Sequence, residues 1–268
     1  MSHANGHANA NDQVVTEITD GVLRVEIRRP EKKNALTTAM YSAMADALAA
    51  GEENPAVRVI LIHGQPGAFT AGNDLGDFLA NPPVQEDPPP PVFRFLKTFA
   101  SLKKPFVAAV TGVAVGVGTT LLLHCDLVYA GESARFQLPF VSLGLCPEAA
   151  SSLMLPALAG HVRAAEMLLL CEPFNAAMAR EVGLVNAVLP DEQVLEHALA
   201  RAKKLAALPT SSVVLTKQML KSAQQSLIEQ TLQSEMRQFK QRLVSPEAKE
   251  AFAAFFEKRK PDFAQFNG

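Results

Sequence analysis

The sequence predicts an α/β fold in which short strands alternate with helices before a helical C-terminal region. Short apolar runs that end at turn-forming residues indicate buried strands, and they cover residues 14–18, 22–27, 57–63, 106–111, 127–130 and 134–137. The first helix should begin at Thr37 or Thr38, because Met40, Met44 and Leu48 then lie on one face. Further helical patterns cover residues 92–102, about 117–125, 149–158, 162–170, 176–182 and 191–207.

We expect three parts in the chain. Residues 1–13 are polar and lack an apolar segment, which predicts a disordered tail. Residues 14–204 hold the strands and form the predicted core, and residues 205–268 form a helical region that is almost continuous from Pro209 to residue 256. Six prolines in residues 81–91 predict a loop without regular structure, and the acyl pocket is one candidate for what it borders.

Composition limits the class of protein. With 25 basic and 27 acidic residues the net charge is −2, so nothing in the total charge favours a nucleic-acid partner. Three cysteines, Cys125, Cys146 and Cys171, are too few and too scattered for a disulfide framework or a zinc cluster, and they predict buried thiols in a reduced, cytoplasmic protein. No apolar run reaches the roughly 18 residues of a membrane span.

Two segments have the composition of a reactive site. Residues 67–75, G-A-F-T-A-G-N-D-L, follow a predicted strand, and Gly72 permits a close approach of backbones, although a simple turn would explain the same residues. In residues 112–118 three glycines open a predicted helix whose first amides have no intrahelical partner. Such amides suit a developing negative oxygen, while packing of the helix on a sheet explains the glycines almost as well.

Together with C-D-L-V-Y-A at residues 125–130, these segments resemble the motifs of the crotonase (enoyl-CoA hydratase/isomerase) family. R-P-E-K-K-N-A-L at residues 29–36 and F-F-E-K-R-K-P-D-F at residues 255–263 match as well, so the resemblance covers about residues 14–263. It implies a crotonase-like spiral of ββα turns and a C-terminal helical trimerisation region, in a homotrimer or a hexamer built as a dimer of trimers. It also implies an acyl-CoA thioester substrate, no cofactor besides the coenzyme A of that substrate, and no metal.

The same resemblance implies an oxyanion hole made by the backbone amides of Ala71 and Val117. Family hydratases activate water with two glutamates, but this sequence has Thr120 and Phe140 at the matching positions, and neither is a useful general base. Instead, P-E-A-A-S-S at residues 147–152 is similar to the segment of the Δ3,Δ2-enoyl-CoA isomerase branch, which makes Glu148 the expected acid and base. A single carboxylate among apolar residues should have a raised pKa, which suits it for moving a proton.

By resemblance, the substrate should contact a set of residues from four segments: Lys32, Lys33, Ala35, Leu36, Gly72, Asn73, Asp74, Leu75, Phe140 and Lys258. A solvated basic surface explains the lysines nearly as well, a helix N-terminal charge would explain Glu148 taken alone, and we favour a structural role for Asp74. Two other functions stay open. One is an enoyl-CoA hydratase or another reaction of the family, and the other is a non-catalytic acyl-CoA-binding protein.

Overall fold

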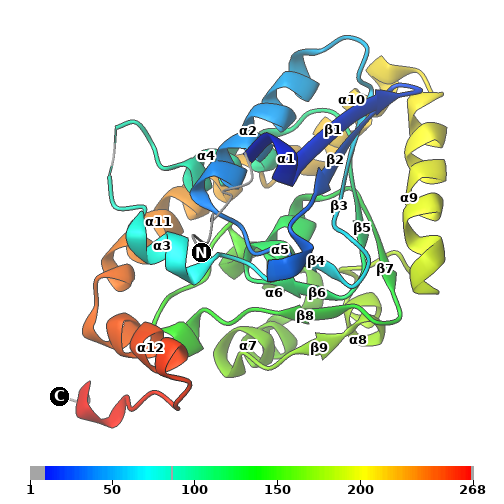
Figure 1. Cartoon of the computed structure of the whole chain (residues 1–268). Helices are drawn as coiled ribbons and strands as arrows, with labels where there is room; N and C mark the ends of the chain where they lie inside the picture. Colours follow the sequence, from blue (N-terminus) through cyan, green and yellow to red (C-terminus); the bar gives the residue numbers. More distant parts are fainter. Residues whose placement is uncertain (1–9, 86, 267–268) are drawn as a thin grey trace, which may run out of the picture.

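Two β-sheets form the centre of the structure, a computed structural model that describes residues 10–85 and 87–266 (Figure 1). The larger sheet has six strands in the order β1 (Val14–Thr19), β2 (Val22–Ile27), β3 (Val59–His63), β5 (Phe106–Val110), β7 (Leu127–Gly131) and β10 (Ala187–Leu189). The smaller sheet has four strands in the order β4 (Ala68–Thr70), β6 (Val113–Val115), β8 (Arg135–Gln137) and β9 (Phe174–Asn175). β1–β2 and β8–β9 are antiparallel, and the other pairs are parallel.

Successive strands of the chain join different sheets. β3, β5 and β7 lie in the larger sheet, and β4, β6 and β8, which follow each of them, lie in the smaller one. This alternation is the predicted ββα spiral, so the predicted fold class is confirmed. The sequence did not predict β4, β6, β9 or β10, each of which has only two or three residues.

The described helices agree closely with the predicted ones. They are α1 (Ala10–Gln13), α2 (Thr38–Glu53), α3 (Leu75–Ala80), α4 (Pro91–Ser101), α5 (Val117–Thr120), α6 (Ser151–Ala159), α7 (His161–Leu170), α8 (Ala176–Glu181), α9 (Asp191–Ala206), α10 (Thr210–Ser222), α11 (Gln225–Leu243) and α12 (Pro246–Glu257). The predicted helix 117–125 is in fact α5 followed by a 3₁₀ helix at Leu121–His124. α3 was not predicted.

Two hydrophobic cores cover the two faces of the larger sheet. Along β3, Ile60 and Ile62 join the core beneath α2 and α4, whereas Val59 and Leu61 point to the other side. There α9 covers the sheet with a stripe of small side chains, and Figure 1 shows it standing alone on that side. Burial on both faces explains why these strands read as continuous apolar runs.

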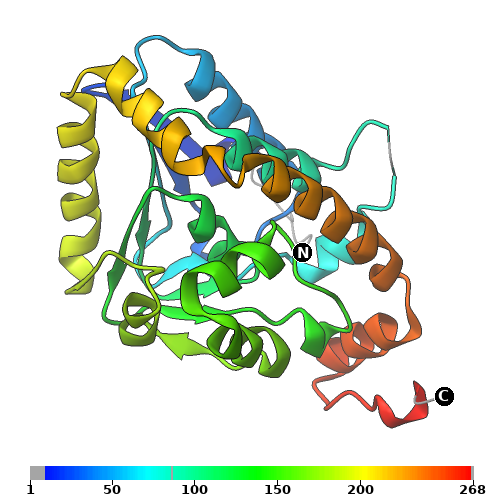
Figure 2. The same cartoon turned by 180° about the vertical axis from the view of Figure 1, so that it is seen from behind.

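The C-terminal helices wrap around the core. Figure 2 shows α10 and α11 running diagonally across the back of the molecule toward α12. The predicted continuous helix after Pro209 is interrupted at residues 223–224 and at residues 244–245. α9 ends at Ala206 and α10 begins at Thr210, close to the predicted boundary, although the division into domains stays a prediction.

Other expectations concern the N-terminus and the cysteines. Most of the predicted tail, residues 1–9, lies outside the described residues, and Ala10–Gln13 form α1 instead of continuing a tail. The three cysteines are free; Cys171 is buried, but Cys125 and Cys146 are only half-buried. Within the residues described, no helix combines the length and the apolar character needed to cross a membrane.

Candidate active site

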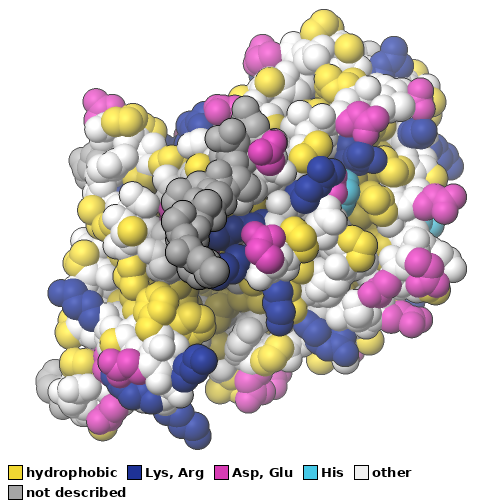
Figure 3. All heavy atoms as spheres, viewed as in Figure 1, with side chains coloured by type: hydrophobic (Ala, Val, Ile, Leu, Met, Phe, Trp, Pro, Cys, Tyr) yellow, Lys and Arg dark blue, Asp and Glu magenta, His cyan; other side chains and the backbone are white. Residues whose placement is uncertain are grey.

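A cavity of about 670 Å³ lies where the ends of β4 and β6 meet the C-terminal helices. Its wall combines the loop after β4, the start of α5, the segment with Phe140 and Glu148, and phenylalanines from α11 and α12. Figure 3 shows hydrophobic side chains gathered in a hollow beside α12. The cavity is therefore mostly apolar, with a small number of polar groups, as is usual for sites that bind organic ligands.

Asn34 fixes the two segments that form one wall of this cavity. Its side chain is fully buried, accepts a hydrogen bond from the amide of Arg29 at 2.6 Å and donates one to the carbonyl of Ala68 at 2.8 Å. The hydroxyl of Thr70 donates to the carbonyl of Asn34 at 2.7 Å. Residues 29–36 are thus locked against β4, which gives the motif in this segment a structural role.

We expected the amide of Ala71 to be free for the oxyanion hole, and this expectation is wrong. Its amide donates to the carbonyl of Lys33 at 2.9 Å and so is already paired. Two residues later, the amide of Asn73 donates to no group in the part of the chain that the structure describes, and neither does the amide of Val117. Both residues line the cavity.

The two free amides belong to loops that are in close contact. β4 and β6 are parallel, so their carboxyl ends meet at one edge of the smaller sheet. Gly72 adopts a φ of 84°, and a Cβ placed on it would lie 3.0 Å from the carbonyl oxygen of Val115. A larger residue would therefore be strained at this φ and would require the carbonyl of Val115 to shift by a few tenths of an ångström. The side chain of Asn73 is held by the hydroxyl of Tyr41, which aims the loop toward the cavity.

Glu148 lines the cavity and is only 3% exposed. Its carboxylate accepts no hydrogen bond from any residue that the structure describes. Burial raises the pKa of Glu148 to about 8, and the charge of Glu235 adds to this effect. A carboxyl group with such a pKa exchanges its proton near neutral pH, as acid–base chemistry requires.

Neither of the two positions at which family hydratases hold glutamates carries a carboxylate in this chain. Thr120 is fully buried and lies outside the cavity wall, and its hydroxyl has no partner among the described residues. Phe140 does line the cavity, but as an apolar ring.

Asp74 is the other carboxylate on the wall, and it already has partners. It forms an ion pair with Arg29 at 2.7 Å and caps the start of α3 by accepting from the amides of Gly76 and Asp77. Burial acts to raise the pKa of Asp74, but the hydrogen bonds from Arg29 and the two amides together lower it. These contacts support the structural role that we favoured.

Most of the predicted substrate contacts do lie on the cavity wall: Lys32, Ala35, Gly72, Asn73, Asp74, Leu75 and Phe140. Three do not. Lys33 contributes its carbonyl to Ala71, Leu36 is buried and pairs with the strand segment at Asn73, and Lys258 lies exposed just after α12.

Sequence reasoning missed the part of the wall that comes from the C-terminal helices, namely Phe239, Phe252, Phe255 and Phe256. It also missed Glu235, which faces Glu148 from α11. The sequence did contain one indication that Glu235 is buried. Ile228, Leu232, Phe239 and Leu243 form the buried stripe of α11, and Glu235 falls on that stripe at helical spacing.

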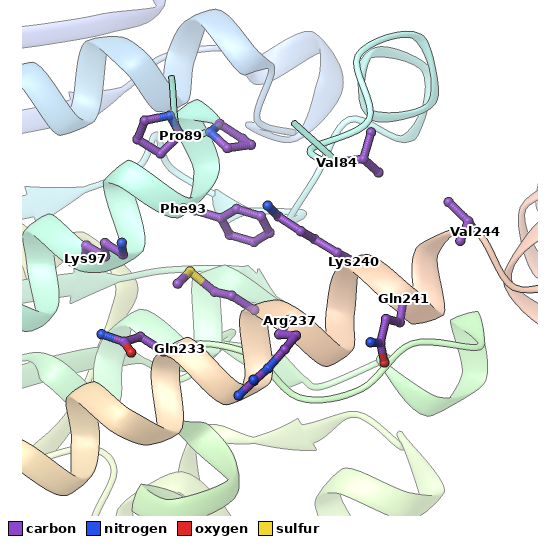
Figure 4. A pocket seen from close by; sticks show the side chains of 11 residues that line it. Val84, Pro89, Phe93, Lys97, Gln233, Arg237, Lys240, Gln241 and Val244 are labelled. Carbon is purple, nitrogen blue, oxygen red and sulfur yellow. The ribbon is translucent and has the colours of Figure 1, made fainter. Parts of the chain in front are cut away.

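A second cavity, of about 680 Å³, lies between α4 and α11 (Figure 4). Val84, Pro89 and Pro90 line it, so the proline-rich loop borders this cavity and not the one with Glu148. Lys240 lies 5.5 Å from the ring centre of Phe93 and donates to the carbonyl of Gln85, which ties the loop to α11. This wall has basic residues but no carboxylate for proton transfer.

No group of three or more His, Cys, Asp or Glu residues that could hold a metal occurs within residues 10–85 and 87–266. The site therefore offers one buried carboxylate and two unpaired amides. Such a site can stabilise a negative oxygen and move a proton next to it.

Comparisons with known proteins identify one family over most of the chain. Residues 17–266 match the model of one protein family, Enoyl-CoA hydratase/isomerase. The chain is 35% identical over 260 residues to 1,2-epoxyphenylacetyl-CoA isomerase of Escherichia coli (strain K12), covering 93% of this chain and 97% of that protein. It is 33% identical over 262 residues to Enoyl-CoA delta isomerase 2 of Rattus norvegicus, covering 96% and 66%.

The fold is also similar to solved structures. An enoyl-CoA hydratase/isomerase from Pseudoalteromonas atlantica T6c has a TM-score of 0.88 and 40% identity, over 94% of this chain and 99% of the other.

Proposed function

Because the chain belongs to the enoyl-CoA hydratase/isomerase family, we propose that it is a Δ3,Δ2-enoyl-CoA isomerase. One observation carries this proposal: the cavity has a single buried carboxylate without a partner, Glu148, while Thr120 and Phe140 occupy the positions of the hydratase glutamates. Moving a double bond requires one group that takes a proton and returns it. Adding water requires that a water molecule be held and activated as well, for which this wall has no second free carboxylate.

In the proposed reaction, the amides of Asn73 and Val117 bind the thioester oxygen of a 3-enoyl-CoA. The Glu148 carboxylate removes a proton from C2, and the electron pair of that C–H bond moves into the enolate, whose oxygen carries the negative charge. The protonated Glu148 then delivers the proton to C4. The electrons of the C3–C4 double bond form the new C4–H bond, the enolate electrons form the C2–C3 double bond, and the carboxylate is restored.

The two amides lower the cost of forming the enolate. In other enzymes, removing one donor of this kind costs roughly 3–4 kcal/mol of transition-state stabilisation. The contribution comes from the backbone, so Val117 can occupy a position where the family usually has glycine. The apolar wall excludes water, which strengthens these hydrogen bonds and disfavours hydration of the product.

The remaining parts of the substrate would occupy the rest of the cavity. Lys32 stands at its wall as a charge for the coenzyme A phosphates, and Phe255 and Phe256 offer apolar surface to the pantetheine or the acyl chain. We further propose a homotrimer, or a dimer of trimers, in which Lys258 of a neighbouring subunit reaches the phosphates. Its exposed position after α12 leaves it free to do so.

The deciding experiment is a paired assay with a 3-enoyl-CoA and a 2-enoyl-CoA, in which double-bond migration and hydration are followed separately. We expect migration without hydration. Glu148→Gln should abolish migration and retain coenzyme A binding, whereas Glu229→Gln, an exposed change on α11, should leave both intact. Undiminished migration in the Glu148→Gln enzyme would exclude the mechanism.

The alternatives predict other outcomes. Hydration at a rate comparable to migration would show that water is activated without glutamates at positions 120 and 140, and would favour a hydratase. Binding of acyl-CoA with neither reaction would favour a binding protein.

A further inference from the structure

Glu235 is a second buried carboxylate that the proposed proton shuttle does not use. It lies on α11 and is only 7% exposed, and it has no ion-pair partner among the residues described. It accepts hydrogen bonds from the amide of Ala150 at 2.6 Å and from the amide of Ser152 at 3.0 Å, and a third from the hydroxyl of Ser152. All three donors belong to the start of α6, directly after Glu148.

These contacts replace a cap that α6 lacks. The residue before the helix is Ala150, and its side chain cannot accept a hydrogen bond from the first turn. Unpaired amides at a buried helix start are costly, and a side-chain oxygen normally satisfies them. Here the oxygen comes from a helix 85 residues away in the sequence.

The segment that Glu235 holds has an unfavourable backbone. Ala149 and Ala150 adopt φ values of 59° and 57°, in the left-handed region that alanine rarely occupies. Such a conformation persists only where surrounding contacts fix it. His124 contributes a further contact, because its Nε2 donates to the carbonyl of Ala149 at 2.7 Å. Two side chains that are distant in the sequence thus help to hold the turn that follows Glu148.

We propose that Glu235 is a positioning residue for Glu148: by capping α6 from α11 it holds the strained turn that aims Glu148 into the cavity, and it places a negative charge beside it. This inference rests on the proposed function for its catalytic consequence. Its structural part, the dependence of the turn on Glu235, holds for any reaction at this site.

The effect of the Glu235 charge on the pKa of Glu148 has a predictable direction. Burial raises the pKa of Glu235, while its hydrogen bonds to Ser152 and Ala150 act in the opposite direction. Glu148 has no such donors, so Glu235 ionises first and its charge then opposes ionisation of Glu148. Removing the charge should therefore lower the pKa of Glu148.

Other titratable groups face this pair. Cys146 lies beside both carboxylates, Tyr41 faces Glu148 from α2, and Arg242 is paired with Glu247. His124 stays neutral near pH 7 because burial lowers its pKa to about 4. None of these groups supplies a positive charge that would cancel the effect of Glu235.

The test compares Glu235→Gln, Glu235→Ala and Ser152→Ala with the exposed control Glu229→Gln, in the full-length protein. For Glu235→Ala we expect kcat for migration to fall about 100-fold, the loss that a misplacement of roughly 1 Å produces. Glu235→Gln keeps one acceptor oxygen, so we expect a smaller loss together with an acid limb of kcat/KM that moves to lower pH. A purely structural role would lower kcat equally at every pH.

Amide hydrogen exchange gives a readout that needs no activity. Exchange at Ala150 and Ser152 should accelerate in the Glu235→Ala protein and remain slow in the Glu229→Gln protein. Unchanged exchange together with an unshifted pH limb would overturn the inference while leaving the isomerase proposal intact. Conversely, migration that survives Glu148→Gln would remove the isomerase proposal, and the exchange result would then decide the positioning role alone.

If Glu235→Ala fails to fold, Glu235→Gln carries the test, because it preserves the size of the side chain and one hydrogen-bond acceptor. A Glu235→Gln enzyme with the kcat and the pH limb of Glu229→Gln would then refute the proposed role.

Discussion

The pH dependence of double-bond migration is the most direct consequence of the buried Glu148. Its pKa of about 8 arises first from burial and second from the charge of Glu235. The carboxylate is the form that removes the proton from C2, so activity should fall as the pH falls through this value. With a pKa of about 8, roughly one tenth of the free enzyme is ionised at pH 7 and one half at pH 8.

This fraction gives the size of the effect. We expect kcat/KM to rise roughly fivefold between pH 7 and pH 8, and to approach a plateau above about pH 9. A glutamate with an ordinary pKa would instead give a flat profile over this range. The assay is migration of the double bond in a 3-enoyl-CoA at low substrate concentration, because kcat/KM reports the ionisation of the free enzyme.

The control is Glu229→Gln, which should reproduce the profile of the unmodified enzyme. If kcat/KM is constant from pH 6 to pH 9 and declines only near pH 5, Glu148 either has an ordinary pKa or is not the base, and the reasoning from its burial is refuted.

Three further outcomes follow from the same contacts. Val117→Pro removes the backbone N–H at a position where a helix tolerates proline, so kcat should fall roughly 100- to 1000-fold. Val117→Ala keeps this N–H and should stay active. Equal activity of the two variants would exclude the amide of Val117 from the oxyanion hole. Asp74→Ala removes the cap of α3 and the ion pair with Arg29, so denaturant titration should show a loss of about 2 kcal/mol, and Asp74→Asn should lose less. Folding raises the pKa of Glu148, so its favourable contribution to stability is complete below about pH 4.5 and is lost as the pH rises through about 8. Glu148→Gln should therefore be more stable than the unmodified protein above pH 8, by on the order of 4 kcal/mol, with little difference at pH 5; a pH-independent difference would contradict the raised pKa.

The sequence was sufficient for those elements whose pattern is local. β3 and β5 are continuous apolar runs, and α2 repeats its buried residues at helical spacing, so their positions could be predicted within two or three residues. β4 and β6 could not be predicted in this way. Each has three residues, and each is a strand because of its neighbours in the sheet: β4 pairs with β6, with Ala68 opposite Val113, and β6 pairs with β8 as well.

The candidate site, too, could be predicted only in part from a local sequence pattern. The motif at residues 67–75 pointed to a loop that lines the cavity, but the amide of Ala71, which we expected to be free, is paired. The amide of Ala71 is paired with the carbonyl of Lys33, 38 residues away, whereas the amide of Asn73 has no acceptor among the residues that the structure describes. A motif gives the identity of neighbouring residues. Whether one of their amides is free depends on hydrogen-bond acceptors in other parts of the chain, which the motif does not include.

Glu148 and Glu235 together show how one fold gives two buried glutamates different tasks. Both are desolvated, which raises the pKa of each. Glu235 receives hydrogen bonds from two amides and a hydroxyl, which favour its charged form and make it a fixed structural acceptor. Glu148 receives none from the part of the chain that the structure describes, so its charged form is unfavourable. In the proposed mechanism, the carboxylate that receives hydrogen bonds holds the turn and does not react, whereas the carboxylate that lacks them among the described residues accepts and releases the proton.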